Sequence, residues 1–543
     1  MAKYSIGIDY GTLSARAILV DVSNGSICAE AEYAYPHGVM DMALPDETPL
    51  EKNSAFQHPK DYLDAAEYTI KKVVEDSSVC VDDVLSLGID FTACTILPID
   101  DGGTPLCFYD EFKSEPHSYV KLWKHHSAQN EADYITWLAK ENNQEWLELY
   151  GGKVSSEWLF PKMLETLNKA PKVFDSSVRF VEAADWLVQQ LTGKEVHSSC
   201  MAGYKGMWNV KDGYPSAEFL EKIHPKFKNV VGTKVSENIL PTGSKAGEIN
   251  EAGCKLSGLS VGTTVAVPII DAHSALPAAG IVSGSKLMAI IGTSTCHIIM
   301  NDKPNPVPGI CGMVQDGIIP GYAAYEAGQA ATGDIFAWFI DKCVPIEYAK
   351  NAQKLYLSVF DYLTQKAEGL PPGSNGVLAL DWWNGNRTPY ADYDLSGMIC
   401  GLTLATKPEE IYRALIESTA FGTKRILNLY KCHGVDVKEI YASGGIAQKN
   451  PFLVQIYADV CGMKIKVPTG RQVAAKGGAI LAACACGYYS TFKAAADAMS
   501  DKEVVEYIPN LENTEIYNKI YSEYCELSEY FARRNKRKEM ENE

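Results

Sequence analysis

Residues 6–21 read IGIDYGTLSARAILVD, and this stretch predicts the fold of the chain. Apolar residues run up to Ile8, a turn follows at residues 9–12, and a second apolar run extends from Ala15 to Val22. This pattern is typical of two strands joined by a tight turn. Residues 287–300 repeat it, with apolar runs on either side of Gly292-Thr293-Ser294. Two ordinary hairpins would look alike in this way, but a repeat half a chain apart favours an internal duplication.

Helical periods and short apolar strands alternate through the rest of the chain. We predict helices at residues 61–74, 135–149, 158–167, 408–430, 451–461 and 516–531, and strands at residues 84–90, 439–442 and 465–467. This mixture is typical of an α/β protein. The length of 543 residues corresponds to two large domains, or to about three of ~100–200 residues each. The Gly- and Ser-rich residues 240–262 are the predicted connection between the halves.

Composition and charge exclude several classes of protein. Apolar residues make up 46% and charged residues 22% of the chain, as in an average globular protein. The net charge of −18 argues against nucleic acid and anionic membranes as partners, although it leaves room for a local nucleotide site. No stretch of ~18 residues is apolar enough for a membrane span, and the start lacks a secretory signal. The 15 scattered cysteines include no C-x-x-C pair, which predicts reduced thiols and a cytoplasmic protein.

Several loops carry candidate chemistry. Because the chain has neither a Walker loop nor a Rossmann fingerprint, the two Gly-Thr turns are the candidates for holding phosphate through their amide groups. Asp9, at the end of the first strand, is a candidate Mg²⁺ ligand through water. Asp271 follows an apolar strand and can act as the base for a hydroxyl, cap the next helix, or do both. Ser443-Gly444-Gly445 opens a helix, where phosphate or a flat ring could approach.

Two further features stay open at this point. Residues 380–389, LDWWNGNRTP, set two tryptophans beside Asn, Gly and Arg, which suits a packed Ω-like loop and a functional loop equally. The predicted C-terminal helix either packs on the body of its own chain or forms the interface of a homodimer.

Longer motifs resemble those of the FGGY carbohydrate kinases, and most closely those of the branch that phosphorylates L-ribulose. They are residues 6–21, 183–193 (AADWLVQQLTG), 202–208 (AGYKGMW), 270–280 (IDAHSALPAAG), 291–297 (IGTSTCH), 325–338 (YEAGQAATGDIFAW), 385–403 and 443–462. The segments AGYKGMW and YEAGQ look specific to that branch. The resemblance implies a duplicated actin-like, ribonuclease-H-like fold with two domains around a cleft. It divides the chain into a sugar-binding domain (1–262), an ATP-binding domain (263–490) and a C-terminal helical extension (491–543).

The resemblance also implies an activity. The γ-phosphoryl group of ATP, with Mg²⁺, would be transferred to O5 of L-ribulose to give L-ribulose 5-phosphate, as in L-arabinose catabolism. One alternative is another kinase of the family, acting on the related ketopentoses D-ribulose or D-xylulose. A more distant alternative is a non-catalytic, actin-like module whose binding is gated by nucleotide.

Individual positions take their expected roles from the same motifs. Asp271 corresponds to the catalytic base and Asp9 to the aspartate linked to Mg²⁺. The expected sugar contacts are Ala93 (through its backbone), Trp123, Lys205, Asp271 and Glu326. The expected nucleotide contacts are Thr12, Gly292, Thr293, Gly328, Gly444, Gly445 and Asn450.

Overall fold

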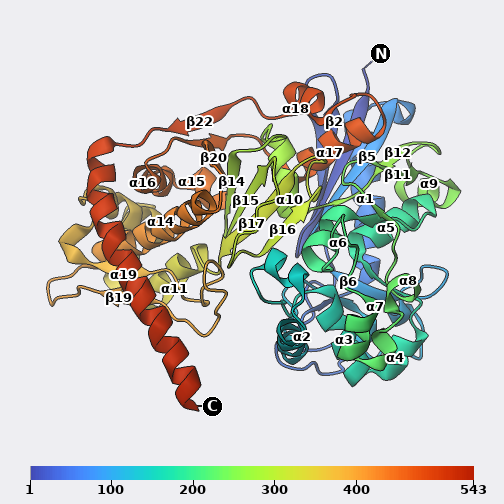
Figure 1. Cartoon of the computed structure of the whole chain (residues 1–543). Helices are drawn as coiled ribbons and strands as arrows, with labels where there is room; N and C mark the ends of the chain where they lie inside the picture. The colour runs from blue at the N-terminus through green and yellow to red at the C-terminus, as the bar shows by residue number, and fades with distance from the viewer. Residues whose placement is uncertain (1, 543) are drawn as a thin grey trace.

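Two seven-stranded sheets organise the molecule, which we describe over residues 2–542 of a computed structural model (Figure 1). In the first sheet, β1, β2 and β3 are antiparallel neighbours, and β5 pairs with β1 in parallel. Its strands are β1 (Tyr4–Tyr10), β2 (Ser14–Asp21), β3 (Ile27–Ala34), β5 (Val84–Phe91), β11 (Lys245–Glu248), β12 (Thr264–Ala266) and β13 (Ile269–Ile270).

The second sheet repeats this arrangement. Here β14, β15 and β17 are antiparallel neighbours, and β20 pairs with β14 in parallel, as β5 does with β1. Its strands are β14 (Lys286–Ile291), β15 (Thr295–Asn301), β16 (Gly312–Gln315), β17 (Ala323–Gln329), β20 (Glu439–Ser443), β21 (Ile465–Pro468) and β22 (Val504–Tyr507). The two strand-turn-strand units therefore occupy equivalent places in the two sheets, which confirms the predicted duplication.

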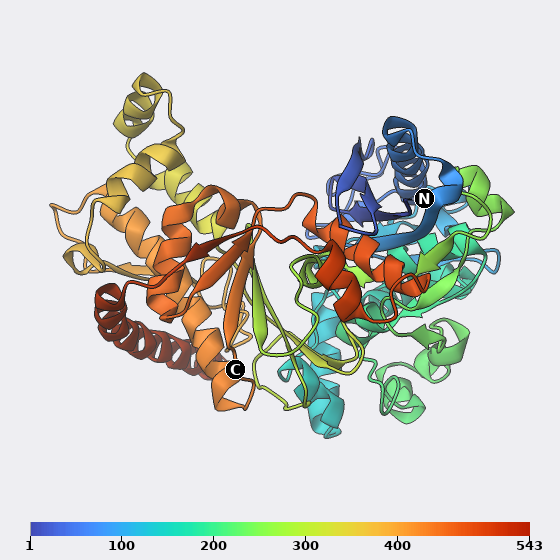
Figure 2. The ribbon, with the colours of Figure 1, turned by 90° about the horizontal axis from the view of Figure 1, so that it is seen from above.

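Helices cover the sheets and form two bodies that lie side by side in Figure 2. Those used below are α1 (Pro59–Ser77), α2 (Gln129–Glu141), α3 (Leu159–Lys169), α5 (Ala183–Thr192), α6 (Ser199–Lys205), α9 (Glu251–Ser257), α10 (Asp271–Ala278), α11 (Gly333–Cys343), α14 (Pro408–Cys432), α15 (Gly445–Lys449), α16 (Pro451–Cys461), α17 (Val473–Ala485), α18 (Phe492–Met499) and α19 (Leu511–Asn542). The first body also carries a small sheet of β4 (Phe56–Gln57), β6 (Ile96–Ile99), β7 (Val120–Lys121) and β8 (Arg179–Glu182).

The chain passes between the bodies more than once. β12 and β13 pair with β5 in the first sheet, so the strands change over to the second sheet between residues 270 and 286. Late in the chain, α17 returns to pack on β1 and β5, and α18 packs on α17 (Figure 2). β22 then pairs with β21 in the second sheet, and α19 packs on α14 and α16. Residues 491–542 therefore contact both bodies.

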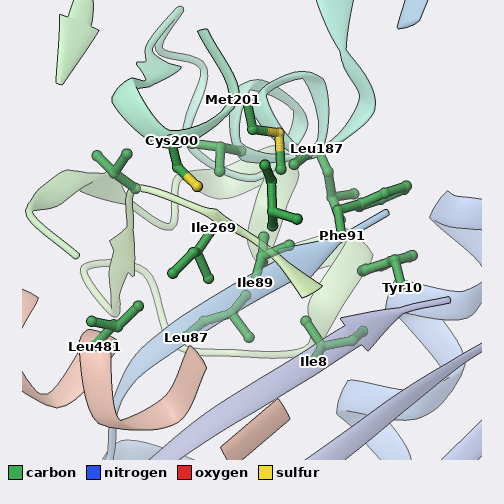
Figure 3. Packing of buried hydrophobic residues seen from close by; sticks show 14 of the residues in the cluster. Ile8, Tyr10, Leu87, Ile89, Phe91, Leu187, Cys200, Met201, Ile269 and Leu481 are labelled. Carbon is green, nitrogen blue, oxygen red and sulfur yellow. The ribbon is translucent and has the colours of Figure 1, made fainter. Parts of the chain in front are cut away.

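Small residues let α17 approach the first sheet. A Cβ at Gly7 of β1 would overlap the backbone oxygen of Ala475, and one at Gly88 of β5 would overlap that of Gly478. Figure 3 shows the core formed here, with Ile8, Leu87 and Ile89 of the strands packed beside Leu481 of α17. On the other face of this core lie side chains of α5 and α6. The core thus fixes the strands whose ends carry the site described below.

Some local predictions are wrong. The helix predicted at residues 135–149 is interrupted, because α2 ends at Glu141, Asn143 adopts a left-handed φ of 49°, and Glu145–Tyr150 form a separate 3₁₀ turn. The predicted connection at 240–262 contains β11 and α9 of the first body. No helix within residues 2–542 is both long enough and apolar enough to cross a membrane.

The C-terminal helix packs on its own chain. Tyr517 and Tyr524 of α19 are fully buried in the core of the second body. Tyr524 donates a hydrogen bond to Asp381 Oδ1 at 2.7 Å, and Tyr517 bonds to Glu417 of α14 at 2.9 Å. A homodimer through this helix stays a prediction.

Candidate functional site

Three aspartates gather at one edge of the first sheet. Asp9 of β1 and Asp90 of β5 are partners in the parallel register, and Ile269 of β13 is the next partner of Asp90. Asp271, the first residue of α10, follows β13 directly. Because the carboxyl ends of neighbouring parallel strands open at the same edge of a sheet, the three carboxylates point into one region.

This region has an excess of negative charge. Asp90 is fully buried, and neither of its carboxylate oxygens has a hydrogen-bond partner in the described part of the chain. Burial, followed by the charges of Asp9 and Asp271, raises the pKa of Asp90. Burial also raises the pKa of Asp9, whose nearest cation, Arg16 Nη1, lies 4.0 Å away. Burial and then the charge of Asp9 raise the pKa of Asp271 to about 7.

Such a group of carboxylates fits Mg²⁺. Hard divalent cations take oxygen ligands, and a cation would offset the charge that raises these pKa values. The unpartnered, buried oxygens of Asp90 behind Asp9 are the observation that supports the fit. The expectation that Asp9 is linked to Mg²⁺ is compatible with this geometry, and Asp90 is a member of the group that the sequence analysis missed.

A second cluster combines Lys205, Glu326 and His273. Lys205 Nζ, at the end of α6, lies 3.5 Å from Glu326 Oε1 of β17, and His273 Nε2 of α10 lies 3.0 Å from Glu326 Oε2. All three side chains are buried, and His273 Nδ1 contacts Cys200 Sγ at 3.1 Å. Burial alone would raise the pKa of Glu326, but Lys205 and then His273 hold it below its usual range. Burial would lower the pKa of Lys205, but Glu326 raises it, so both groups stay charged.

The cluster adjoins the aspartates. Asp271 and His273 belong to the same first turn of α10, and the charges of Glu326 and Lys205 act on the pKa of Asp271. A buried, charged pair with free hydrogen-bonding capacity suits a ligand rich in hydroxyl groups. Three of the expected sugar contacts, Lys205, Asp271 and Glu326, are therefore brought together.

The other two expected sugar contacts lie in loops of the first body. Ala93 follows β5, and its carbonyl accepts a hydrogen bond from Thr95 Oγ1 at 3.2 Å. Trp123, just beyond β7, is 36% exposed, and its Nε1 donates to Thr12 Oγ1 at 3.1 Å. Trp123 therefore stands beside the first Gly-Thr turn, with much of its ring open to a ligand.

The two Gly-Thr turns are each closed by a hydrogen bond from the glycine amide, although the first turn is one residue longer than the second. Gly11 N donates to Ser14 O at 3.0 Å, and Gly292 N donates to Ser294 O at 2.9 Å. Each turn joins the first two strands of its sheet, so Thr12 and Thr293 occupy equivalent positions in the two bodies. This equivalence matches the expectation that both turns approach the same phosphate chain.

A cavity of about 700 Å³ opens beside Asp9 and is lined mainly by the second body. Its walls comprise residues 443–445, 447–448, 467–473, Val505 and Tyr507, with Asp9 and Glu30 from the first body. This size is typical of pockets for small organic ligands. Gly444 shapes it, because its φ is 96° and a Cβ there would overlap Ile291 O. The predicted residues Gly444 and Gly445 both line this cavity.

The other five expected nucleotide contacts do not line this cavity. Thr12, Gly292 and Thr293 belong to the two turns, and the remaining two lie elsewhere. Asn450 accepts a hydrogen bond from Leu453 N at 3.0 Å and so caps α16. Gly328 lies inside β17, next to Arg387. Conversely, the sequence analysis missed Arg471, Gln472 and Tyr507 of the cavity wall. Their only local signal is the Thr-Gly pair at 469–470, which indicates a turn without indicating a ligand.

Comparison with known proteins identifies both halves. Residues 4–277 match the N-terminal domain of the FGGY family of carbohydrate kinases, and residues 287–486 match its C-terminal domain. A protein named ribulokinase from Bacillus licheniformis is 48% identical over 528 residues, which cover 96% of each chain. One of the same name from Geobacillus thermodenitrificans is 47% identical, covering 98% of this chain and 95% of its own.

Solved structures with lower identity share the fold. A xylulose kinase from Lactobacillus acidophilus superposes with a TM-score of 0.80 at 20% identity, covering 98% of both chains. A glycerol kinase from Plasmodium falciparum, solved with ADP, superposes with a TM-score of 0.74 at 17% identity, covering 97% of this chain and 98% of its own.

Proposed function

Because this chain belongs to the FGGY family of carbohydrate kinases, we propose that it phosphorylates L-ribulose with ATP. The products are L-ribulose 5-phosphate and ADP, and the reaction serves L-arabinose catabolism in the cytoplasm. The proposal rests on relatives named ribulokinase that are 46–48% identical over nearly the whole chain. The observation that carries it is the placement of Asp271 beside the buried Lys205–Glu326 pair and near Asp9, which lines the cavity.

The transfer needs a base, a bound sugar and a positioned phosphate chain. Asp271 accepts the proton of the sugar O5 hydroxyl as a bond forms between O5 and the γ-phosphorus. The bond from that phosphorus to the bridging oxygen of the β-phosphate breaks, and ADP leaves with the electron pair. Asp9, with Asp90 behind it, would hold Mg²⁺, which offsets phosphate charge when bound. General-base help of this kind contributes about 10²–10⁴-fold to the rate.

The sugar would lie between the two bodies. Lys205 donates hydrogen bonds to its hydroxyl groups, Glu326 accepts them, and Trp123 offers an apolar face. A sugar that lacks one of the bonded hydroxyls would leave a buried charge without its partner, which is costly. In this proposal the first body supplies most of the sugar contacts, while the second body supplies the nucleotide cavity and Glu326. Gly444 and Gly445 would approach the nucleotide, and Thr12 and Thr293 its phosphates.

A panel of acceptors tests the proposal. The purified protein is given Mg²⁺ and ATP with L-ribulose, D-ribulose, D-xylulose or glycerol, and ADP release is followed by a coupled assay. We expect the highest kcat/KM with L-ribulose. A higher kcat/KM with D-ribulose or D-xylulose would change the proposed substrate to that sugar, while the proposed phosphoryl transfer from ATP would still hold. Slow ATP turnover that no sugar increases would instead favour a nucleotide-gated binding module.

A further inference from the structure

Arg387 lies in the loop between β18 (Leu378–Leu380) and β19 (Met398–Cys400), within the segment LDWWNGNRTP whose role stayed open above. Its half-buried side chain runs across β17 at Gly328. A Cβ built on Gly328 would stand 3.1 Å from Arg387 Cδ and 3.3 Å from Nη1. Thr388, the next residue, accepts a hydrogen bond from Gly328 N at 3.3 Å. The bare backbone of Gly328 is therefore the surface on which this guanidinium rests.

Among the side chains that the structure describes (residues 2–374 and 376–535), no carboxylate lies within 4.0 Å of the Arg387 guanidinium. There, the ion pairs of arginine with carboxylates at 4.0 Å or less involve Arg16, Arg179, Arg413 and Arg471. The groups that act on the charge of Arg387 are Cys311, Tyr393, Glu157 and Cys296. Burial raises the pKa of the Cys311 thiol to about 11 and that of Cys296 well above its usual value, so both are neutral at pH 7.

A half-buried guanidinium whose polar neighbour is Tyr393, with no described carboxylate within 4.0 Å, is costly because the protein replaces only part of its hydration. Its planar array of donors matches the oxygens of a phosphate group. Arg387, which packs on the backbone of Gly328 without a close carboxylate, is therefore suited to bind an anionic ligand reversibly.

The position of Arg387 indicates which anionic group it binds. Glu326 and Gly328 are two residues apart on β17, so they face the same side of the sheet, and Glu326 feels the charge of Arg387. Along the paired strand, Cys296 lies opposite Gly328 and Thr295 opposite Gln329, immediately after the Gly292–Ser294 turn. Arg387 thus stands between the proposed sugar contact Glu326 and a proposed phosphate turn. In phosphoryl transfer, the group between sugar and nucleotide is the one being transferred.

We infer that Arg387 binds the transferred phosphoryl group, first as the γ-phosphate of ATP and then as the 5-phosphate of the product. This inference rests on the proposed function. The guanidinium holds two of the phosphoryl oxygens while the bond to the leaving oxygen breaks and the bond to the sugar oxygen forms. It thereby neutralises charge in the transition state from the side of the second body, opposite the aspartates. Gly328 keeps this approach close, since a Cβ there would stand 2.9 Å from Thr295 O of the paired strand and would press on the arginine.

Binding measurements test this role without relying on turnover. The dissociation constants of ADP, of the non-hydrolysable analogue AMP-PNP and of L-ribulose 5-phosphate are measured by calorimetry for the wild type, Arg387→Met and Arg387→Lys. We expect Arg387→Met to weaken AMP-PNP and L-ribulose 5-phosphate by about tenfold or more while ADP changes less than about twofold. Arg387→Lys keeps the charge but not the paired donors, so its values should lie between the other two.

Glu157→Gln is the matched control, because the charge of Glu157 also acts on Arg387. If Arg387 served only to pair with Glu157, this variant would change AMP-PNP affinity as much as Arg387→Met does, and the inference would be wrong. Equal weakening of ADP and AMP-PNP in Arg387→Met would also overturn it, because that pattern indicates general damage. Thermal melting shows whether each variant is folded, and Arg387→Lys serves if Arg387→Met is not.

Kinetics separate this inference from the proposed function. If the wild type phosphorylates L-ribulose, kcat of Arg387→Met should fall by about 10²-fold or more, with little change in the KM for L-ribulose. An unchanged kcat would refute the role of Arg387 and leave the substrate assignment intact. If the wild type does not use L-ribulose, selective loss of AMP-PNP affinity in Arg387→Met would still support the phosphoryl site.

Discussion

Replacing Asp271 by Asn should abolish most turnover and at the same time stabilise the folded protein. The activity should fall because an amide cannot accept the O5 proton, and a loss of about 10²–10⁴-fold is typical for a general base. The stability should rise because the native carboxylate sits near Asp9 in a region poor in solvent. The charged base at this position thus lowers the barrier of the reaction but destabilises the folded protein in the absence of ligands.

The size of the stability effect follows from the pKa. The folded-state pKa of Asp271 is about 7, against 3.8 for the free side chain, and at about 1.4 kcal/mol per unit this difference corresponds to roughly 4 kcal/mol. Because the side chain keeps some exposure, we expect about half of that, ~2 kcal/mol. The folded pKa is the higher one, so between about pH 4 and 7 the folded state binds a proton that the unfolded state has lost. Stability therefore falls as pH rises through this window, and the full penalty is present at pH 8.

The assay is thermal or urea unfolding of wild type and Asp271→Asn at pH 5 and pH 8, without nucleotide or Mg²⁺. We expect the variant to gain a few degrees in Tm at pH 8 and clearly less at pH 5. In parallel, the wild-type kcat/KM should rise about tenfold per pH unit below pH 7 and level off above it, because this ratio reports the free enzyme, whose base loses its proton in that range. Affinities for ADP and L-ribulose should stay within a few-fold of the wild type.

Three results would refute this reasoning. A variant that is equally stable or less stable at pH 8 would mean that the carboxylate is not strained in the protein without nucleotide. Unchanged kcat would remove Asp271 from the role of base. A wild-type kcat/KM that is flat between pH 6 and pH 8, with chemistry shown to be rate-limiting, would show that the pKa of Asp271 in the free enzyme lies well below about 7.

Three further substitutions probe separate parts of the molecule. Glu326→Ala leaves Lys205 without its partner 3.5 Å away and should raise the KM for L-ribulose about tenfold or more, but that for ATP far less; equal effects would place Glu326 outside the sugar site. Gly444→Ala would overlap Ile291 O and should weaken ADP without weakening L-ribulose, as two titrations would show. Tyr524→Phe removes the donor to Asp381 Oδ1 and should cost about 1–3 kcal/mol in urea unfolding, whereas no change would mean that water replaces the hydroxyl.

The parts of the fold that local patterns predict are those held by local chemistry. The turn at Gly11 and the turn at Gly292 each follow a run of apolar residues, and each joins antiparallel strands as predicted. The placement of α17 was not predictable in this way. Its sequence is apolar on nearly all sides, which indicates burial but not the sheet that buries it. Only the overlap that side chains at Gly7 and Gly88 would produce identifies its partner, and that is a long-range property.

In the candidate site, too, some residues could be predicted from local sequence, whereas others depend on long-range contacts. Asp9 and Asp271 stand at the ends of apolar strands, so their position was readable from alternation alone. Asp90 also ends a strand, yet its significance depends on its register with Asp9, which is fixed only by the pairing of β1 with β5. Arg471 and Tyr507 come to the cavity from a loop and from a strand that closes the sheet at its far edge. No local pattern could connect these residues.

The charges that the protein itself places in the site are unbalanced in two places, and the two imbalances have opposite signs. On the first body, Asp9, Asp90 and Asp271 concentrate negative charge that raises their own pKa values. On the second body, no carboxylate of a described side chain lies within 4.0 Å of Arg387, while Lys205 and Glu326 between the bodies already balance each other. A metal ion bound to ATP would neutralise part of the negative charge of the aspartates, and the γ-phosphate would neutralise the positive charge of Arg387. The aspartates and Arg387 lie on different bodies. Binding of the metal to the first and of the γ-phosphate to the second would therefore favour approach of the two bodies, and only ATP with its metal ion supplies both groups. The net charge of −18 is compatible with this arrangement, since recognition depends on these few local groups rather than on the field of the whole protein.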